Sequence, residues 1–249
     1  MKALLLAAGR GERMRPLTDT TPKPLLEAGG KRLIEWHLEK LAAAGVRDVV
    51  INTAHLAAQF PRTLGDGSRY GLRLEYSREG EVPLETGGGM LHALPLLGDA
   101  PFLAINADTF TDFDFTALCP QPQGVAELVL VDNPPQHPRG DFGIDAAGKL
   151  LPRADSPGAT RALTFAGIGM YRPEILRDWR ATIGDAPGAR ETPPRFSIAP
   201  LLRAAMARGE IQWRHHRGFW TDVGTPQRLA DLDARLRSLL PPSPAKERS

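Results

Sequence analysis

The N-terminal half of the chain alternates between short apolar runs and segments with helical spacing. Residues 3–8 form a continuous apolar run, which is the pattern of a strand buried on both faces. Between residues 33 and 44 the apolar side chains recur at helical spacing, and Gly45 follows where such a helix would end. A β-branched run at residues 49–51 comes next. This order of strand, helix and strand predicts parallel strands joined by crossover helices.

Further segments continue the pattern toward the C-terminal region. Strands are predicted at residues 72–76, 102–106, 128–131, 163–170 and 211–215, and helices at 90–97, 173–183, 198–207 and 226–239. Ser197 is the predicted N-cap of the helix at 198–207, and the glycines and prolines of residues 184–195 predict a loop. We therefore expect an α/β protein with a mostly parallel mixed sheet and helices on both faces. We expect one domain over residues 1–240 and a disordered tail at 241–249.

Composition narrows the class of protein and its partners. The 249 residues are 42% hydrophobic and carry a formal net charge of +2, which suits a folded core and does not suit a disordered polyelectrolyte. The arginines are scattered without a basic stripe, so we expect no nucleic-acid partner.

The sequence also indicates a cellular compartment. Cys119 is the single cysteine, which excludes an internal disulfide and a multi-thiolate metal site and favours the reducing cytoplasm. No apolar run reaches the length of about 18 residues that a membrane span needs. The run after Lys2 is too short for a signal peptide. We expect neither membrane insertion nor export.

A glycine-rich loop that carries several cations follows the first apolar run. Residues 6–18 read LAAGRGERMRPLT, and Lys23 follows in the string PKPL. Small residues let backbone N–H groups approach a ligand closely, and Arg13, Arg15 and Lys23 add positive charge, a combination that suits a triphosphate. The Walker pattern is excluded because no Gly-Lys-Ser/Thr ends the loop, and the dinucleotide fingerprint because Met14 stands at its third small position. The glycines alone are also compatible with a plain turn and solvated cations.

Two aspartates and a second glycine-rich segment add to the candidate site. Asp108 follows the strand predicted at 102–106, at the end where α/β proteins bind ligands, and Asp222 lies in the string FWTDVGT. Carboxylate oxygens are hard ligands that suit a metal ion, although either aspartate could equally be a cap or turn residue. Residues 83–89 read PLETGGG. Glycines at the start of a helix let a ligand lie against N–H groups and the positive end of the dipole, and a flexible hinge is the other interpretation.

Taken together, these strings resemble the signature of the sugar-phosphate nucleotidyltransferases, the pyrophosphorylases that make nucleoside-diphosphate sugars. The resemblance extends over residues 2–232 and implies a Rossmann-like nucleotidyltransferase fold, with Arg13 and Lys23 as catalytic residues and Mg²⁺ held by Asp108 and Asp222. It implies nucleotide contacts from Leu6, Ala8, Gly9, Gly11, Glu12, Arg13, Lys23, Glu85, Thr86, Gly87 and Asn106, and sugar contacts from Gly88, Asp141 and Gly167. The chain departs from the family at Ala107, where a glycine is usual, in the length of the 184–195 loop, and in an extension after residue 235.

Three strings indicate a branch within the family. PLETGGG, RGDF at residues 139–142 and LTFAGI at 163–168 are most similar to those of the short uridylyltransferases of bacterial cell-wall recycling. This likeness implies UTP and a muramate 1-phosphate as small-molecule substrates, and by charge alone Arg139 is a candidate partner for the lactyl carboxylate of muramate.

Two alternative functions stay open from the sequence, as does the oligomeric state. Within the same chemistry, the chain could transfer a guanylyl, thymidylyl or cytidylyl group to another sugar phosphate. Outside it, the chain could be a regulatory module that binds a nucleotide sugar without turnover. The presence of Arg13, Lys23, Asp108 and Asp222 together disfavours this second alternative.

Overall fold

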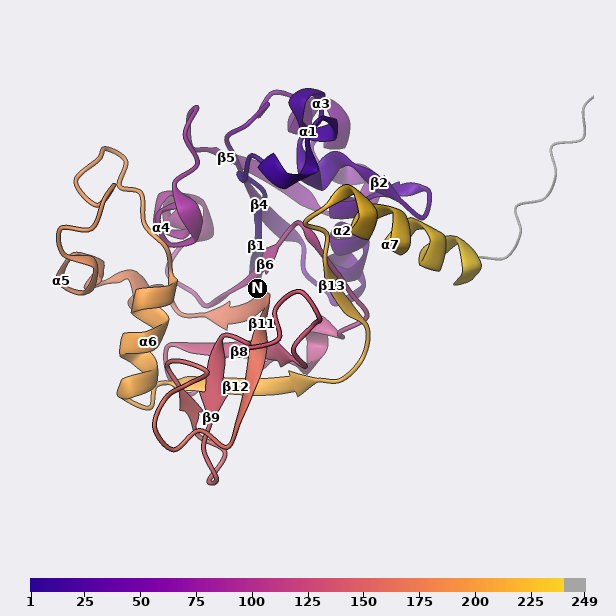
Figure 1. Ribbon diagram of the computed structural model, residues 1–249. Helices are drawn as coiled ribbons and strands as arrows, with labels where there is room; N and C mark the ends of the chain where they lie inside the picture. Colours follow the sequence, from indigo (N-terminus) through magenta and orange to yellow (C-terminus); the bar gives the residue numbers. More distant parts are fainter. Residues whose placement is uncertain (240–249) are drawn as a thin grey trace, which may run out of the picture.

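The structure is a computed structural model that describes residues 1–239, and it is built around one mixed sheet (Figure 1). Among the described residues this sheet has nine strands in the order β10-β9-β11-β6-β1-β4-β5, with β8 beside β11 and β12 beside β8. The strands are β1 (Lys2–Leu6), β4 (Asp48–Thr53), β5 (Arg73–Arg78), β6 (Phe102–Asn106), β8 (Ala126–Val131), β9 (Phe142–Ile144), β10 (Leu150–Leu151), β11 (Arg161–Tyr171) and β12 (Ile211–His216). Strands β6, β1, β4 and β5 run parallel, whereas β11 is antiparallel to both β6 and β8.

Helices cover both faces of the parallel part of the sheet. The helices are α1 (Leu17–Thr20), α2 (Leu33–Ala43), α3 (Gln59–Leu64), α4 (Glu85–Leu97), α5 (Trp179–Ile183), α6 (Ala199–Ala207) and α7 (Pro226–Leu239). Ala3 and Leu5 of β1 pack in one hydrophobic cluster with Leu38 of α2, and Leu4 packs in a second cluster with Met90 of α4. All of these side chains are at most 1% exposed. Because both faces of β1 are buried, its sequence is a continuous apolar run, and the predicted fold class is confirmed.

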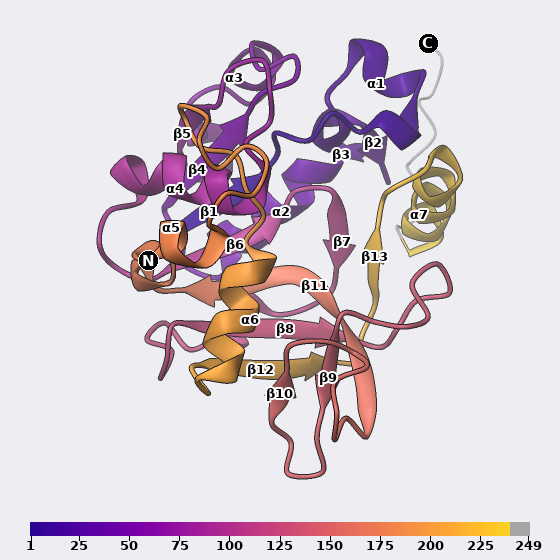
Figure 2. The same cartoon turned by 60° about the vertical axis from the view of Figure 1, so that its left-hand side comes forward.

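Two short ribbons lie outside the main sheet, and the sequence patterns did not predict them. Strands β2 (Glu27–Ala28) and β3 (Lys31–Arg32) form one, and β7 (Thr109–Thr111) and β13 (Trp220–Asp222) form the other. Figure 2 shows β7 and β13 side by side, next to α7. These two strands have three residues each and lie far apart in the sequence, so local periodicity cannot indicate their pairing.

The segment predicted as one helix at 173–183 is divided. Residues Pro173–Leu176 form a 3-10 helix, and α5 begins only at Trp179. The Trp179 ring stacks on Phe196, with 4.6 Å between the ring centroids. This contact favours a break between the two segments, because tertiary packing overrides local helix propensity.

Two element ends also differ from the prediction, and distant residues explain both. Strand β1 ends at Leu6 rather than at residue 8, and the N–H of Ala7 donates to Asn52 Oδ1 at 2.6 Å. The N-cap of α6 is Ile198 rather than Ser197, and its N–H donates to Thr86 Oγ1 at 3.0 Å. The start of α6 is therefore fixed by a residue in the first turn of α4.

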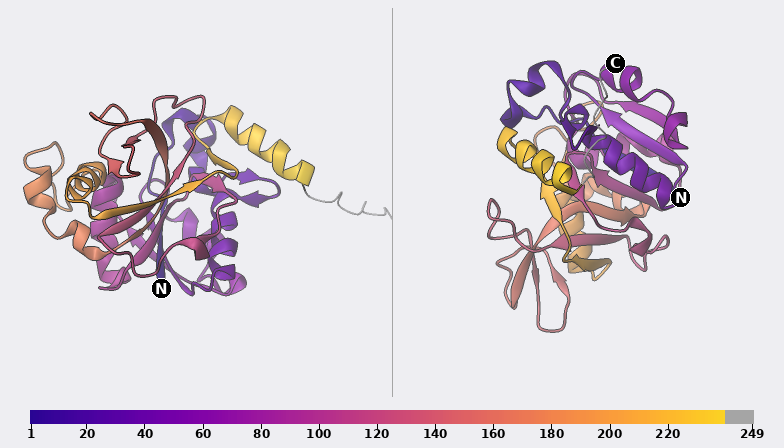
Figure 3. Two further views of the ribbon diagram at one scale, coloured as in Figure 1. Left: turned by 90° about the horizontal axis from the view of Figure 1, so that it is seen from below. Right: turned by 90° about the vertical axis from the view of Figure 1, so that its right-hand side faces the viewer.

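Helices α6 and α7 lie at opposite edges of the molecule (Figure 3). Helix α7 spans Pro226–Leu239, as predicted. Residues 241–249, for which we predicted disorder, lie outside the described part of the chain. Within residues 1–239, no helix is both long and apolar enough to cross a lipid bilayer.

Candidate active site

The carboxyl ends of three parallel strands open into a cavity of about 680 Å³, called here the loop cavity. Leu6 of β1 stands opposite Asn52 of β4 on one side and opposite Asn106 of β6 on the other. The lining includes ten of the predicted nucleotide contacts: Leu6, Ala8, Gly9, Gly11, Glu12, Arg13, Lys23, Glu85, Thr86 and Asn106. This edge of an open α/β sheet is where such folds bind their ligands.

Gly11 brings the first glycine-rich loop against Lys23. Its φ of 64° lies in the left-handed region, and a Cβ added there would come within 2.9 Å of the Thr18 methyl group and 3.2 Å of Lys23 Cβ. The Gly11 carbonyl also accepts a hydrogen bond of 2.9 Å from the Thr18 hydroxyl. A larger residue would strain the backbone and push the loop away from Lys23.

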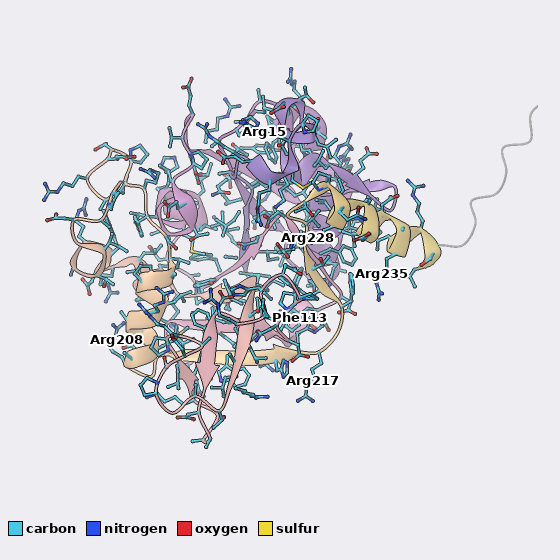
Figure 4. All side chains as sticks on the ribbon, in the orientation of Figure 1. Arg15, Phe113, Arg208, Arg217, Arg228 and Arg235 are labelled. Atoms are coloured by element: carbon cyan, nitrogen blue, oxygen red, sulfur yellow. The ribbon has the colours of Figure 1, made fainter. Side chains whose placement is uncertain are left out.

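The structure separates Arg13 from Arg15 of this loop. Arg13 is exposed on a 3-10 turn at Glu12–Met14 and lines the loop cavity. Arg15 instead pairs with Asp19 at 3.2 Å on the surface, and Figure 4 shows it beside α1 at the periphery of the molecule. Of the two, Arg13 alone is placed to meet a ligand in the loop cavity, as the resemblance implies.

Lys23 is a buried cation with a specific partner. The residue is 7% exposed, and its Nζ lies 2.5 Å from Asp108 Oδ2. The neighbouring Ala107, where the family usually has glycine, is fully buried in the cluster on the α2 face of the sheet. Its methyl group therefore packs in the core and leaves the Lys23–Asp108 pair unobstructed.

Ribbon β7–β13 brings the two predicted metal ligands together. Asp222 is paired with Thr109 across the ribbon, and the Val223 N–H donates to the Asp108 carbonyl at 2.8 Å. Both carboxylates line a second cavity of about 380 Å³, called here the carboxylate cavity, which Arg13 also lines. Each carboxylate faces a cation, because Lys23 pairs with Asp108 and Arg228 of α7 pairs with Asp222. Figure 4 places Arg228 at the start of α7, near the centre of the view.

The donor set at this point fits a hard divalent cation. Two carboxylates line the carboxylate cavity, and the Gln136 amide orients one of them by donating to Asp222 Oδ1 at 2.7 Å. Residues 1–239 contain no cluster of three or more His, Cys, Asp or Glu side chains that could enclose a metal by themselves. Mg²⁺ characteristically uses one or two carboxylates and takes its other ligands from water and substrate phosphates. Asp108 and Asp222 match that requirement.

Gly87, a predicted nucleotide contact, and Gly88, a predicted sugar contact, do not line the loop cavity, the carboxylate cavity or the third cavity described below. Their N–H groups both donate to the Phe196 carbonyl at 2.9 Å. A Cβ at Gly87 would come within 2.5 Å of the Phe196 ring, and one at Gly88 within 2.5 Å of the Pro194 carbonyl. These two glycines let the 184–195 loop and its C-terminal end pack against α4, and the ligand contacts stay predictions.

Glu85 has an unusual backbone for a residue that is not glycine. Its φ is 61°, in the left-handed region, where an L-residue is strained by roughly 1–2 kcal/mol. Its side chain is half-exposed, lines the loop cavity and lies 3.6 Å from Arg195 Nη1. Strain of this kind is concentrated at ligand sites, which supports the predicted nucleotide contact.

A buried hydrogen-bond chain joins the two glycine-rich segments, and sequence reasoning missed it. Asn52 Oδ1 accepts from Ala7 N, Asn52 Nδ2 donates to Glu79 Oε1 at 2.5 Å, and Glu79 Oε2 accepts from Leu84 N at 2.7 Å. Burial raises the pKa of Glu79. A Cβ at Gly89 would come within 2.6 Å of both the Asn52 amide and the Glu79 carboxylate. In the sequence, the third glycine of PLETGGG is therefore the one feature that points to this hydrogen-bond chain. It indicates close packing against the chain and not ligand binding.

The predicted sugar contacts Asp141 and Gly167 meet at a third cavity of about 190 Å³ between β11 and α6, called here the α6 cavity. Asp141 Oδ2 accepts the Phe165 N–H at 2.8 Å, and Oδ1 lies 3.1 Å from His137 Nε2. Gly167 has a φ of 72°, and a Cβ there would come within 2.5 Å of Asn106 Nδ2. Both residues also line the carboxylate cavity, so the two cavities adjoin. Arg139 is exposed and lines none of the three cavities described here.

His37 beneath ribbon β7–β13 predicts an acid-sensitive stability. It is fully buried, its Nε2–H donates to the Thr109 carbonyl at 2.7 Å, and burial lowers its pKa to about 4. Because the unfolded chain takes up this proton near pH 6.5, the free energy of unfolding is expected to fall by about 3 kcal/mol as the pH drops from 6.5 to 4. Urea unfolding across this range measures the slope.

The matched variant for this prediction is His37→Phe, which cannot take up a proton. Whatever its absolute stability, its free energy of unfolding is expected to fall less steeply with acid than that of the wild type. Equal slopes for the two proteins would show that His37 does not carry the effect.

Comparison with known proteins identifies the family to which this arrangement belongs. The family model described as nucleotidyl transferase matches residues 2–238. The chain is 46% identical to N-acetylmuramate alpha-1-phosphate uridylyltransferase of Neisseria meningitidis serogroup B, over 94% of this chain and 97% of that protein. It is 34% identical to the enzyme of the same name from Caulobacter vibrioides, over 94% and 96% of the two chains.

A solved structure supports the fold independently. The crystal structure of a Bacillus anthracis protein, named as a glucose-1-phosphate thymidylyltransferase, superposes with a TM-score of 0.77 over 98% of both chains at 20% sequence identity. At that identity the likeness concerns the fold alone. With the family model covering nearly the whole described chain, the protein belongs to the nucleotidyl transferase family.

Proposed function

We propose that this protein transfers a uridylyl group from UTP to N-acetylmuramate α-1-phosphate, which gives UDP-N-acetylmuramate and pyrophosphate for cell-wall recycling. The observation that carries the proposal is the meeting of the loop cavity and the carboxylate cavity. Arg13, Asn106 and Asp108 line both of them. A nucleotide in the loop cavity and an acceptor beyond it would therefore meet beside two cations and two carboxylates. The sequence identity to the Neisseria enzyme supports the choice of base and sugar.

The proposed reaction is an in-line displacement at the α-phosphorus. An oxygen of the sugar 1-phosphate attacks this phosphorus, the bond to the β-phosphate breaks, and pyrophosphate leaves with the electron pair. The attacking phosphate is already anionic, so no side chain has to remove a proton. Arg13 can bind two phosphate oxygens at once, and Lys23 supplies a compact charge. The side chains therefore act by positioning and by neutralising the negative charge of the transition state.

Asp108 and Asp222 are the proposed holders of a Mg²⁺ ion. A bound divalent cation would neutralise phosphate charge and orient the triphosphate. Asp222 is the last residue of β13, and Asp108 lies in the turn before β7. The hydrogen bond from Val223 N–H to the Asp108 carbonyl joins these two segments. Their spacing is thus fixed by backbone pairing and does not depend on a mobile loop.

A pyrophosphate-release assay tests the proposed function. UTP, GTP, dTTP and CTP are each combined with the 1-phosphates of N-acetylmuramate, N-acetylglucosamine, glucose and mannose, with Mg²⁺ and with EDTA. We expect the highest kcat/KM for UTP with N-acetylmuramate α-1-phosphate, and loss of release with EDTA. A higher value for another pair would reassign the substrates. No release with any pair would favour a nucleotide-sugar-binding module.

A further inference from the structure

The α6 cavity extends the acceptor side of the site beyond the carboxylates. Asn106, Asp141, Phe165 and Gly167 line both the α6 cavity and the carboxylate cavity. The inner wall of the α6 cavity is mostly apolar and aromatic, with Met90, Phe142, Tyr171 and Leu202 among its residues. A sugar held over Gly167 would therefore have room on this side for a substituent with an apolar part.

Arg203 is the single Lys or Arg side chain among the residues that line this cavity. It forms no ion pair with any residue of 1–239, whereas Arg195 before α6 pairs with Glu191 at 2.9 Å and Arg208 after α6 pairs with Glu210 at 2.7 Å. The one carboxylate in the lining, Asp141, already accepts the Phe165 N–H. Arg203 is thus a solvent-exposed guanidinium at this cavity that no carboxylate of residues 1–239 pairs with.

Two backbone N–H groups at the start of α6 already have partners. The N–H of Ile198 donates to Thr86 Oγ1, and the N–H of Ala199 donates to Ser197 Oγ at 3.2 Å. Pro200 has no N–H at all. These two N–H groups are therefore not free for an anionic substituent, and Arg203 is the side chain of the lining that carries the complementary charge.

We infer that the α6 cavity is a carboxylate subsite in which Arg203 binds the lactyl carboxylate of N-acetylmuramate α-1-phosphate. This inference rests on the proposed function and adds the residue that distinguishes a muramate from a glucosamine. The planar guanidinium can hold a carboxylate through two parallel hydrogen bonds, and the apolar wall accepts the lactyl methyl group. Arg139, the candidate by charge alone, lies outside this cavity.

The experiment compares Arg203→Ala and Arg203→Lys with the wild type. Kinetics with UTP are measured for N-acetylmuramate and N-acetylglucosamine 1-phosphates, and binding of the two UDP-sugar products is measured by calorimetry. For Arg203→Ala we expect kcat/KM for the muramate substrate to fall about 10- to 100-fold, mainly through KM, because a charge-assisted hydrogen-bonded pair is lost. The glucosamine substrate is expected to be unaffected. Arg203→Lys should restore part of the loss, and UDP-N-acetylmuramate should bind Arg203→Ala less tightly by a similar factor.

Arg208→Ala is the matched control, because Arg208 is the C-cap of the same helix and does not line the cavity; Figure 4 labels it beside α6. It should leave both substrates unchanged. Equal loss for both substrates in Arg203→Ala, or a selective loss in Arg139→Ala instead, would overturn the subsite. A wild-type enzyme that does not prefer the muramate substrate would overturn the proposed function itself. A clear wild-type preference that survives in Arg203→Ala would overturn the subsite alone.

Discussion

Replacement of Lys23 with methionine is expected to lower kcat about 10²- to 10³-fold, the effect of losing one preorganised charge in an active site. The Lys23 side chain is buried, points its Nζ at Asp108 and lines the loop cavity. Methionine keeps a long apolar stem in the same space, so packing is preserved. The KM for UTP should rise less than kcat falls, because the charge matters most when negative charge builds up around the α-phosphorus.

Lys31→Met is the control for this prediction. Lys31 also pairs with a carboxylate, Glu39 at 2.6 Å, but on the exposed side of α2. Its loss should leave kcat unchanged. The free energy of unfolding of Lys23→Met should differ from that of the wild type by only about 1 kcal/mol or less, since the Asp108 carboxylate left behind is partly solvated. A kcat within a few-fold of the wild type would contradict a catalytic role for Lys23.

Replacement of Asp222 with asparagine is the second large expected effect. The variant should lose about 10²-fold or more in kcat/KM and need a higher Mg²⁺ concentration for half-maximal activity. An amide is a weaker ligand for a hard cation than a carboxylate, while β13 and its pairing with β7 stay the same. Titration of the variant with Mn²⁺, followed by electron paramagnetic resonance, measures cation affinity without any turnover.

Asp231→Asn gives the matched comparison. Asp231 lies on α7, close to Asp222 in the sequence, and its carboxylate accepts from Gln227 at the exposed surface. It should bind Mn²⁺ as the wild type does. Wild-type Mn²⁺ affinity in Asp222→Asn would remove Asp222 from the metal site, whatever its activity.

The sequence was sufficient for the parts of the site that lie next to one another in the chain. The run at 3–8 indicated a strand buried on both faces, so the cations of the loop after it, Arg13, Arg15 and Lys23, were expected near the end of that strand. The choice of Arg13 over Arg15 came from the family resemblance. The juxtaposition of Asp108 and Asp222 was predicted only through the family resemblance. It depends on two three-residue strands that lie far apart in the sequence, and such short strands have no periodicity to detect.

Other parts of the site were not predictable because long-range packing decides them. Gly87 and Gly88 satisfy the pattern of a ligand-binding loop, yet the space beside them is filled by Phe196 and Pro194. Asn52 and Glu79 stand in no motif and act through a buried hydrogen-bond chain. The choice between Arg139 and Arg203 requires knowing which arginine borders a cavity, and charge alone cannot supply that.

The two ion pairs at the carboxylate cavity would have to break when ligands bind, because each aspartate and each cation would then contact a ligand instead. Lys23 and Arg228 neutralise Asp108 and Asp222 within the protein itself. A divalent cation that approaches the aspartates must compete with these side chains, and the phosphates of a nucleotide offer both side chains a new partner. By thermodynamic reciprocity, the metal and the nucleotide should then each raise the affinity for the other. The resting protein would thus discriminate against either ligand alone and respond to the metal–nucleotide complex as a unit.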